Sequence, residues 1–426
     1  MALEVQNLSV FAQGGSILRN ISFSLNAGEK LLIVGRSGSG KTTLLRAIAG
    51  IAQHIFNLRV SGHVRIYGER IDLYTASRHI YYVPQEPWYS LYTPYPVLET
   101  LSYAEQLNDV EPLARKLGIY NKLVAPSTEL SAGEAQRINI LHAILSRSSI
   151  VLIDEATSYL DQESKIEVVK ALKTLSEQGT AIIVVDHDLR LWRGFVDKVL
   201  YIEDGGTKLY DDPLETPIAQ DLENLNKRLA EIGEKGRGGS CQDTVAVAEN
   251  IWFKYPDAED YIIKGASLNV CAGELVWVKG SSGKGKSTLL KILAGILKPS
   301  RGSVRRFTRS VQLIPENPLQ YISSPTVAEE LNYREDIAIL ANLQHRFNSP
   351  ITFLSSGERR RLAIASAFIR SPRLLLIDEP TVGLDPWNAI SILTLLLKLL
   401  EKGSSIVVAS HGEELSYIAS RIVEVR

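Results

Sequence analysis

The stretch Gly35-Arg36-Ser37-Gly38-Ser39-Gly40-Lys41-Thr42-Thr43 follows an apolar run at residues 31–34 and precedes the helical pattern LLRAIAG. It matches G-x-x-x-x-G-K-[ST] completely, and the order strand, glycine loop, helix is the context that a phosphate-binding loop requires. The pattern recurs as Gly280-Ser281-Ser282-Gly283-Lys284-Gly285-Lys286-Ser287-Thr288, again between an apolar run and a helical pattern, LLKILAG. Two copies in 426 residues predict two repeated α/β domains.

The two loops predict where the phosphates of a nucleotide bind. Their glycines let backbone N–H groups approach phosphate oxygens at a helix N-terminus. Lys41 and Lys286 would reach the β- and γ-phosphates, and Thr42 and Ser287 would ligate Mg²⁺. The alternative is a glycine-rich turn without ligand, which the flanking strand and helix argue against. The residues predicted to bind nucleotide here are Gly35, Ser37, Gly38, Gly40, Lys41, Thr42, Thr43, Gly280, Ser282, Gly283, Gly285, Lys286, Ser287 and Thr288.

Two apolar runs, at residues 150–153 and 374–377, each end in an acidic pair, Asp154-Glu155 and Asp378-Glu379. A continuous apolar run is typical of a buried parallel strand. Acids at its carboxyl end face the crevice where open α/β sheets bind ligands. The first acid of each pair suits Mg²⁺ and the second suits a general base acting on water. Taken alone, such a pair could simply be solvated, but each follows a phosphate-binding loop.

Histidines and a serine-glycine stretch complete the repeat. His187 and His411 each follow a further apolar run. LSAGEAQR begins at Leu130 and LSSGERRR at Leu354, and by itself S-x-x-E is only the capping box of a helix. The glycines of the two stretches are separated in the chain by the same interval as the two aspartates and as the two histidines. This shared register favours a function for the stretch beyond its cap.

The order of phosphate loop, glutamine, LSxGE signature, Asp-Glu strand and histidine resembles that of the ATP-binding cassette (ABC) ATPases. The resemblance covers nearly the whole chain as two fused cassettes. It implies that each cassette has a mainly parallel sheet core, an N-terminal antiparallel β region and a small helical subdomain that carries the signature. It also implies that the cassettes close head to tail, with two ATP molecules between them, each bound with Mg²⁺.

The resemblance also implies residue roles. Ser131 and Gly133 would contact the γ-phosphate held by Lys286, and Ser355 and Gly357 the one held by Lys41. Glu155 and Glu379 would be the catalytic bases, His187 and His411 would sense the γ-phosphate, and Asp154 and Asp378 would hold Mg²⁺. Asp161 and Asp385 would communicate across the interface. Tyr255 resembles the ring that stacks on adenine, and Phe11 is its less clear counterpart; either ring could instead be core.

The two cassettes differ at the glutamine. Gln85 matches the family residue that meets Mg²⁺ and the attacking water, whereas the second cassette has Glu316. Lys284 stands where a small residue is usual, and it could offset the added charge or only face solvent. We therefore expect two unequal sites, both hydrolysing ATP because both bases and both histidines are present.

Composition bounds the domains and their surroundings. The segment GEKGRGGS at residues 233–240 is flexible by composition, so we expect a first domain at 1–232, a linker at 233–243 and a second domain at 244–426.

The net charge of −1 argues against a nucleic-acid partner. The apolar run 390–400 is too short to cross a bilayer, which needs about 20 residues. Cys241 and Cys271 lie at no metal or redox spacing, which indicates a reducing compartment with no disulfide framework.

The stretch NPLQYISSPTVAEEL at 317–331 and FKYP at 253–256 resemble the ATPase subunits of energy-coupling-factor importers of cobalt, nickel and vitamins. The resemblance implies a protein at the cytoplasmic face of the membrane, partnered by a transmembrane coupling protein and a membrane substrate-binding protein. Trp88, Tyr89, Tyr92 and Tyr95 suit a groove for a partner's helix, or they are packing and turn residues. The alternatives are a soluble tandem cassette acting on ribosomes or DNA, and a nucleotide-binding scaffold without turnover.

Overall fold

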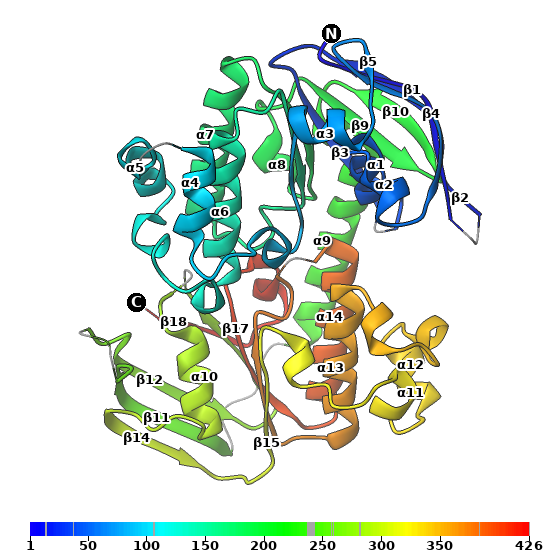
Figure 1. The fold of residues 1–426 in the computed structure, drawn as a ribbon. Helices are drawn as coiled ribbons and strands as arrows, with labels where there is room; N and C mark the ends of the chain where they lie inside the picture. Colours follow the sequence, from blue (N-terminus) through cyan, green and yellow to red (C-terminus); the bar gives the residue numbers. More distant parts are fainter. Residues whose placement is uncertain are drawn as a thin grey trace. The chain divides into compact units, whose positions relative to one another are not determined.

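The computed structural model describes residues 1–12, 15–36, 38–104, 107–236, 243–256, 258, 260–280, 283–382 and 384–425. The chain divides into two compact units, Met1–Leu222 and Glu223–Arg426 (Figure 1). The predicted linker at 233–243 remains a prediction: helix α9 (Pro217–Gly236) includes its first residues, and residues 237–242 lie outside the described part. Ser37, Ser282 and the side chains of Trp88 and Tyr89 also lie outside it.

The first unit is built on two sheets. A six-stranded sheet has the order β10-β9-β3-β8-β7-β6 and is parallel except for β10 at its edge. An antiparallel sheet has the order β2-β1-β4-β5. The strands are β1 Leu3–Ala12, β2 Gly15–Leu25, β3 Lys30–Gly35, β4 Arg59–Ile66, β5 Glu69–Arg70, β6 Ile80–Val83, β7 Ile150–Asp154, β8 Ala181–Val185, β9 Lys198–Glu203 and β10 Gly206–Tyr210.

The helices of the first unit include a separate helical group. In Figure 1, α4, α5 and α6 lie together, away from the antiparallel strands β1, β2 and β4. The helices are α1 Lys41–Ile48, α2 Ile51–His54, α3 Leu73–His79, α4 Pro96–Tyr103, α5 Leu107–Lys116, α6 Ala132–Leu145, α7 Gln162–Glu177, α8 Leu189–Trp192 and the start of α9, with 3-10 turns at Pro87–Ser90, Tyr120–Lys122, Ser127–Glu129 and Pro213–Glu215.

The second unit repeats this plan in shorter form. Its five-stranded sheet, β15-β16-β17-β13-β18, is parallel, and its antiparallel sheet has the order β12-β11-β14. Nothing in it corresponds to β5 and α3 among the described residues. Its elements are β11 Thr244–Phe253, β12 Ile263–Cys271, β13 Leu275–Lys279, α10 Lys286–Ala294, β14 Arg301–Arg306, β15 Val311–Ile314, α11 Val327–Glu330, α12 Glu335–Leu340, α13 Ser356–Arg370, β16 Leu374–Asp378, α14 Pro386–Glu401, β17 Ser405–Ser410 and β18 Arg421–Glu424, with 3-10 turns at Pro318–Gln320, Gln344–Arg346, Ile351–Phe353 and Glu413–Tyr417.

The parallel strands are apolar throughout because both faces of each sheet are covered. In β13 the side chains alternate between two cores. Leu275 and Trp277 pack with the apolar residues of α13 and α14, and Val276 and Val278 pack with those of β11, β12 and α10. The predicted fold class, two cassettes with parallel cores, antiparallel β regions and helical subdomains, is confirmed.

Two smaller expectations had different outcomes. In the described part of the chain, no helix combines the length and apolar character needed to cross a membrane. Cys271, at the end of β12, is disulfide-bonded, which contradicts the expectation of a chain without disulfides. Cys241 lies outside the described residues.

Candidate functional site

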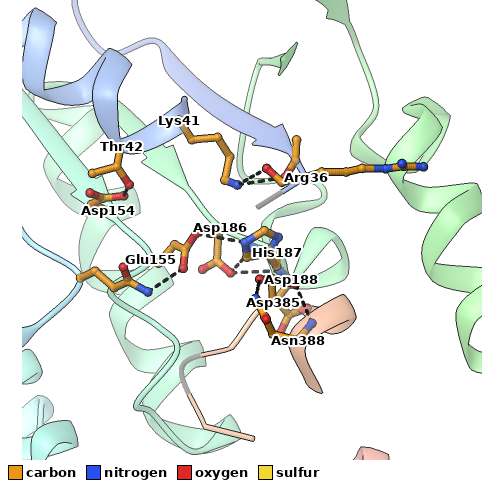
Figure 2. A network of polar contacts seen from close by, with 12 residues as sticks. Arg36, Lys41, Thr42, Asp154, Glu155, Asp186, His187, Asp188, Asp385 and Asn388 are labelled. Carbon is orange, nitrogen blue, oxygen red and sulfur yellow. Dashed lines mark hydrogen bonds and ion pairs between the residues drawn. The ribbon is translucent and has the colours of Figure 1, made fainter. Parts of the chain in front are cut away.

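The first phosphate-binding loop connects β3 to α1 and directs Lys41 inward. Lys41 is buried, and its Nζ donates to the backbone oxygens of Gly35 at 2.9 Å and Arg36 at 3.1 Å (Figure 2). Gly40 has φ 99°, and a Cβ on Gly35 would lie 2.5 Å from the carbonyl oxygen of Ile202. A β-carbon is therefore excluded at Gly35, and left-handed φ favours glycine at Gly40. This loop leaves the amides at the start of α1 available to an anion.

The second loop connects β13 to α10 with the same geometry but a different lysine contact. Gly285 has φ 84°, and Nζ of Lys286 donates to the backbone oxygen of Gly280 at 2.8 Å. The same Nζ lies 3.3 Å from Oε1 of Glu379. Lys284 is exposed, so of its two interpretations the solvent-facing one agrees with its position.

Asp154 ends β7 and is almost completely buried. Oγ1 of Thr42 donates to its Oδ1 at 3.0 Å (Figure 2), and the hydroxyl of Tyr82 on β6 donates to its Oδ2 at 2.7 Å. Burial raises the pKa of Asp154 to about 6, and the charge of Glu155 adds to the effect, whereas both hydrogen bonds oppose it. A carboxylate and a hydroxyl held this close are oxygen ligands of the kind that Mg²⁺ binds.

Asp378 ends β16 in the second unit and has a poorer environment. Its Oδ1 is buried with no hydrogen-bond partner among the described residues. The position of Tyr82 is occupied in this unit by Leu313, which has no donor. Burial again raises the pKa of this carboxyl to about 6, and a hydrogen bond with Ser287 opposes it. A buried carboxylate oxygen without a partner is costly in protein alone, so these residues fit Mg²⁺.

Glu155 and Glu379 both adopt left-handed backbone, with φ 49° and 45°. The amide of Glu155 donates to Val185 O at 2.8 Å, and that of Glu379 to Ala409 O at 2.8 Å. These bonds fix each glutamate to the neighbouring strand just as its own strand ends. Non-glycine residues in this region cost about 1–3 kcal/mol and gather at functional sites.

In the first unit the predicted glutamine and histidine both contact Glu155. Nε2 of Gln85 donates to Oε2 of Glu155 at 2.9 Å. Nε2 of His187 lies 3.0 Å from Oε1 of Glu155 (Figure 2). The backbone amide of His187 donates to Asp186 Oδ1 at 2.6 Å, and Asp186 in turn accepts from the hydroxyl of Thr157. Two side chains predicted from separate motifs, Gln85 and His187, therefore meet at the carboxylate of Glu155.

In the second unit His411 contacts Glu379 through its other ring nitrogen. Nδ1 of His411 lies 3.1 Å from Glu379 Oε1, and Ser410 donates to Oε2 at 2.8 Å. Burial alone would raise the pKa of Glu379, but the hydrogen bond and charge of His411, together with Lys286 and Ser410, outweigh it and lower the pKa. Burial raises the pKa of Glu316, and the charge of Glu379 adds to it. These effects oppose ionisation of Glu316, which when ionised adds negative charge where the first unit has an amide.

Both signatures form the capping boxes expected of them. Oγ of Ser131 accepts from the amide of Glu134, whose carboxylate accepts from the Ser131 amide at 2.9 Å. Ser355 and Glu358 repeat the pair at the start of α13. Each signature serine therefore begins a helix, where N-terminal amides favour an anion.

These units match a known family. The sequence model of the family described as ABC transporter matches residues 18–158 and 263–382. The chain belongs to this family. It is accordingly an ATPase with tandem ABC cassettes, which bind ATP with Mg²⁺.

Relatives of this ABC protein span nearly the whole chain. A protein of Methanosarcina acetivorans, named as a candidate ABC transporter ATP-binding protein, is 28% identical over 454 residues, which cover 96% of this chain and 86% of the relative. A protein of Sulfurisphaera tokodaii with the same name is 28% identical and covers 91% of this chain and 88% of its own length.

Solved structures resemble the tandem ABC fold as a whole. The structure titled RNase-L Inhibitor has a TM-score of 0.68 at 22% identity and covers 98% of this chain and 87% of its own. An archaeal ribosome recycling factor, solved with a ribosomal stalk protein, has a TM-score of 0.65 at 22% identity, covering 96% and 84%. At such identities the likeness shows the fold alone.

The aromatic residues predicted to stack on adenine differ between the two ABC cassettes. Tyr255 is exposed, and its hydroxyl lies 3.2 Å from Oγ1 of Thr288 at the start of α10. Phe11 is partly buried on β1, with the guanidinium of Arg59 4.7 Å from its ring centre. Tyr255 therefore lies beside its phosphate-binding loop, whereas one face of Phe11 contacts an arginine.

Each ABC cassette has a buried glutamate that holds a loop in place through backbone amides, and the motifs did not predict either glutamate. Glu99 accepts from the amides of Tyr92 and Thr93 at 2.7 and 2.6 Å, and Glu330 accepts from those of Ser323 and Ser324 at 3.0 and 3.1 Å. Glu99 and Glu330 stand in the same repeat register as Gln85 and Glu316, so the sequence contained this signal. Asp161 and Asp385, predicted to communicate between cassettes, are the N-caps of α7 and α14.

Proposed function

We propose that this ABC ATPase is the ATP-hydrolysing subunit of an importer of the energy-coupling-factor type. It works as a peripheral protein on the cytoplasmic face of the membrane, with a transmembrane coupling protein and a membrane substrate-binding protein. The names of its relatives support a transporter, and the resemblance of residues 253–256 and 317–331 supports this subtype.

Within each cassette the proposed roles follow from the contacts. Lys41 and Lys286 exchange their loop carbonyl contacts for β- and γ-phosphate oxygens. Thr42 with Asp154, and Ser287 with Asp378, hold Mg²⁺, which supplies positive charge beside the transferred phosphoryl group. Glu155 and Glu379 accept the proton of the attacking water, and His187 and His411 hold those carboxylates in place. Gln85 and Glu316 position the water.

The signatures complete the proposal. Following the family resemblance, Ser131 and Gly133 meet the γ-phosphate held by Lys286, and Ser355 and Gly357 meet the one held by Lys41. Cleavage of the γ-phosphate then removes the charge that each capped helix start binds, which makes the pair of cassettes a switch driven by ATP.

One surface observation carries the importer proposal: an apolar face on the first unit. Tyr92, Tyr95, Leu98 and Leu101 are 78%, 45%, 53% and 43% exposed. Leu98 and Leu101 lie three residues apart on α4, so they share one side of the helix. The buried residues of α4 are Pro96, Glu99 and Thr100. Glu99 accepts a hydrogen bond from the amide of Tyr92 and so holds that loop in place.

The second unit provides the comparison that makes this face unusual. In the register that aligns Glu99 with Glu330, the corresponding positions are Ser323, Thr326, Glu329 and Asn332. The same framework therefore presents an apolar face in one cassette and a polar one in the other. Packing within a cassette does not demand the apolar residues, and a helix of a membrane partner is a suitable occupant of such a face.

The test exchanges the two faces. Leu98→Glu with Leu101→Asn installs the second unit's residues in the first, and it should reduce recovery of the chain with detergent-extracted membrane proteins by about tenfold or more. ATPase activity of the purified chain should stay near that of the parent, since neither side chain lies in the nucleotide site. Glu329→Gln is the matched control and should leave recovery unchanged. Recovery with ribosomes and with no membrane protein would replace the importer by a soluble, ribosome-acting ATPase.

A further inference from the structure

The two nucleotide sites differ at two corresponding positions: the first unit has two amide side chains there, and the second has two side chains of opposite charge. Glu316 stands at the position of Gln85 when the glutamine segments of the two units are aligned. Arg360 stands at the position of Gln136 when the two signatures are aligned. The first unit thus has glutamine at both positions, and the second has an acid and a base.

In the first unit the two glutamines connect the signature helix to the base. Gln136 on α6 is fully buried, and its Nε2 donates to the backbone oxygen of Pro84 at 3.2 Å. Gln85, which follows Pro84 in the chain, donates to Oε2 of Glu155 at 2.9 Å. Oε1 of Gln136 has no hydrogen-bond partner among the described residues. The side-chain amide of Gln136 therefore holds the backbone at Pro84, and the side-chain amide of the adjacent Gln85 contacts the base Glu155.

In the second unit the connection takes a different route. Arg360 on α13 is buried, and its Nη1 donates to the backbone oxygen of Glu379 itself. An ionised Glu316 has no proton to donate, so it cannot copy the bond between Gln85 and Glu155. It is instead repelled by Glu379. The charge of Arg360 attracts it most, and those of His411 and Lys286 attract it less. A buried carboxylate without a nearby cation would be costly, and Arg360 is the arginine of the signature helix whose charge acts on Glu316.

We propose that Arg360 is a positioning residue of the second nucleotide site, which offsets the charge of Glu316 and holds the backbone of Glu379. The pair Glu316–Arg360 then does with opposite charges what Gln85 and Gln136 do with neutral amides. The inference rests on the proposed role of Glu379 as the base. It explains how a site with an additional acid retains an ordered base.

A double-mutant cycle tests the pairing through ATP hydrolysis. In a Glu155→Gln chain, where only the second site keeps its base, Arg360→Gln should lower kcat by about tenfold with KM near the value before the change, because it leaves Glu316 and Glu379 to repel each other. Glu316→Gln with Arg360→Gln reproduces the amide pair of the first unit and should return kcat to within about threefold of the parent. The cycle is run in the unaltered chain and in a Glu155→Gln chain, so it reports whether the sites turn over together or separately.

The reciprocal transplant is the matched control in the first unit. Gln85→Glu alone should lower kcat, and adding Gln136→Arg should restore part of it. Arg360→Lys keeps the charge and should retain more activity than Arg360→Gln. If Arg360 had only a structural role, adding Glu316→Gln would not restore the activity of Arg360→Gln. The thermal midpoint would then fall by the same amount in Arg360→Gln and in the double variant.

The outcomes separate the inference from its premise. If Glu379→Gln leaves ATPase activity unchanged in both chains, the base assignment fails, and the role of Arg360 fails with it. If Glu379→Gln lowers activity but the effects of Glu316→Gln and Arg360→Gln simply add, only the pairing is overturned.

Discussion

The hydroxyl of Tyr82 donates a 2.7 Å hydrogen bond to Oδ2 of Asp154, and the second unit has Leu313 in its place. The corresponding aspartates of the two units, Asp154 and Asp378, thus have different hydrogen-bond partners. Asp154 has two donors from protein, whereas Oδ1 of Asp378 has none among the described residues. A partner that orients a metal ligand affects the affinity for the metal.

Tyr82→Phe should therefore weaken the first metal site. Loss of the donor leaves a buried charged acceptor short of one bond, which costs about 1–3 kcal/mol of stability. The Mg²⁺ concentration for half-maximal ATPase activity should rise by about tenfold. Tyr81→Phe, on the same strand, is the control and should leave the Mg²⁺ response unchanged. An unaltered Mg²⁺ response in Tyr82→Phe would show that Thr42 suffices to orient Asp154.

Glu155→Gln and Glu379→Gln should each lower ATPase activity, because both glutamates have the same strained backbone and a histidine contact. A general base contributes about 10²–10⁴-fold at its own site. The variant with both changes should have almost no activity. Steady-state phosphate release measures all three. If either single change has no effect, that site is regulatory or silent.

The metal-free protein should lose stability as pH rises. Burial raises the pKa of Asp154 and Asp378 to about 6, above their ordinary value of 3.8. A carboxyl whose folded pKa is raised contributes stability that is full below about pH 4 and lost as pH rises through about 6. The loss is on the order of 3 kcal/mol for each aspartate. Glu379, whose pKa is lowered, acts in the opposite direction only below its ordinary value of 4.5.

Denaturant unfolding in EDTA at pH 5 and pH 7.5 measures the part of this loss that lies above pH 5, about 1.4 kcal/mol for each aspartate. Asp154→Asn and Asp378→Asn should each flatten the pH dependence, since an amide does not titrate. Adding Mg²⁺ should restore stability at pH 7.5 in the parent but less in the variants. Equal slopes in the parent and both variants would assign the pH dependence to other groups.

Gly133→Ala should destabilise its unit more than Gly357→Ala does. A Cβ on Gly133 would lie 2.9 Å from the backbone oxygen of Tyr159, whereas one on Gly357 would lie 3.0 Å from the side chain of Asn388. A side chain can move more easily than a backbone carbonyl, so we expect a difference of about 1 kcal/mol. Thermal unfolding of the nucleotide-free chain compares them. Equal midpoints would contradict the steric argument.

Local sequence determined the frame of the molecule. Glycines and the lysine at Gly35–Thr43, continuous apolar runs such as 150–153, and the S-x-x-E caps at Ser131 and Ser355 each specify backbone within a few residues. The structure places strand, loop, strand and helix start where these patterns predict them. The role of the glutamate in each Asp-Glu pair was predicted from its chemistry and its place at the end of an apolar run.

Only the tertiary structure decided which side chains meet. Tyr82 and Asp154 lie on different strands far apart in the sequence, and Arg360 reaches the backbone of Glu379 from a different helix. These contacts depend on strand order, because β6, β7 and β8 lie side by side and end at one edge of the sheet. A motif fixes the residue types at that edge, but packing across the sheet sets their distances, burial and charge. The sequence thus determined two ATPase cassettes, and the fold determined that their two sites are built with different supporting residues.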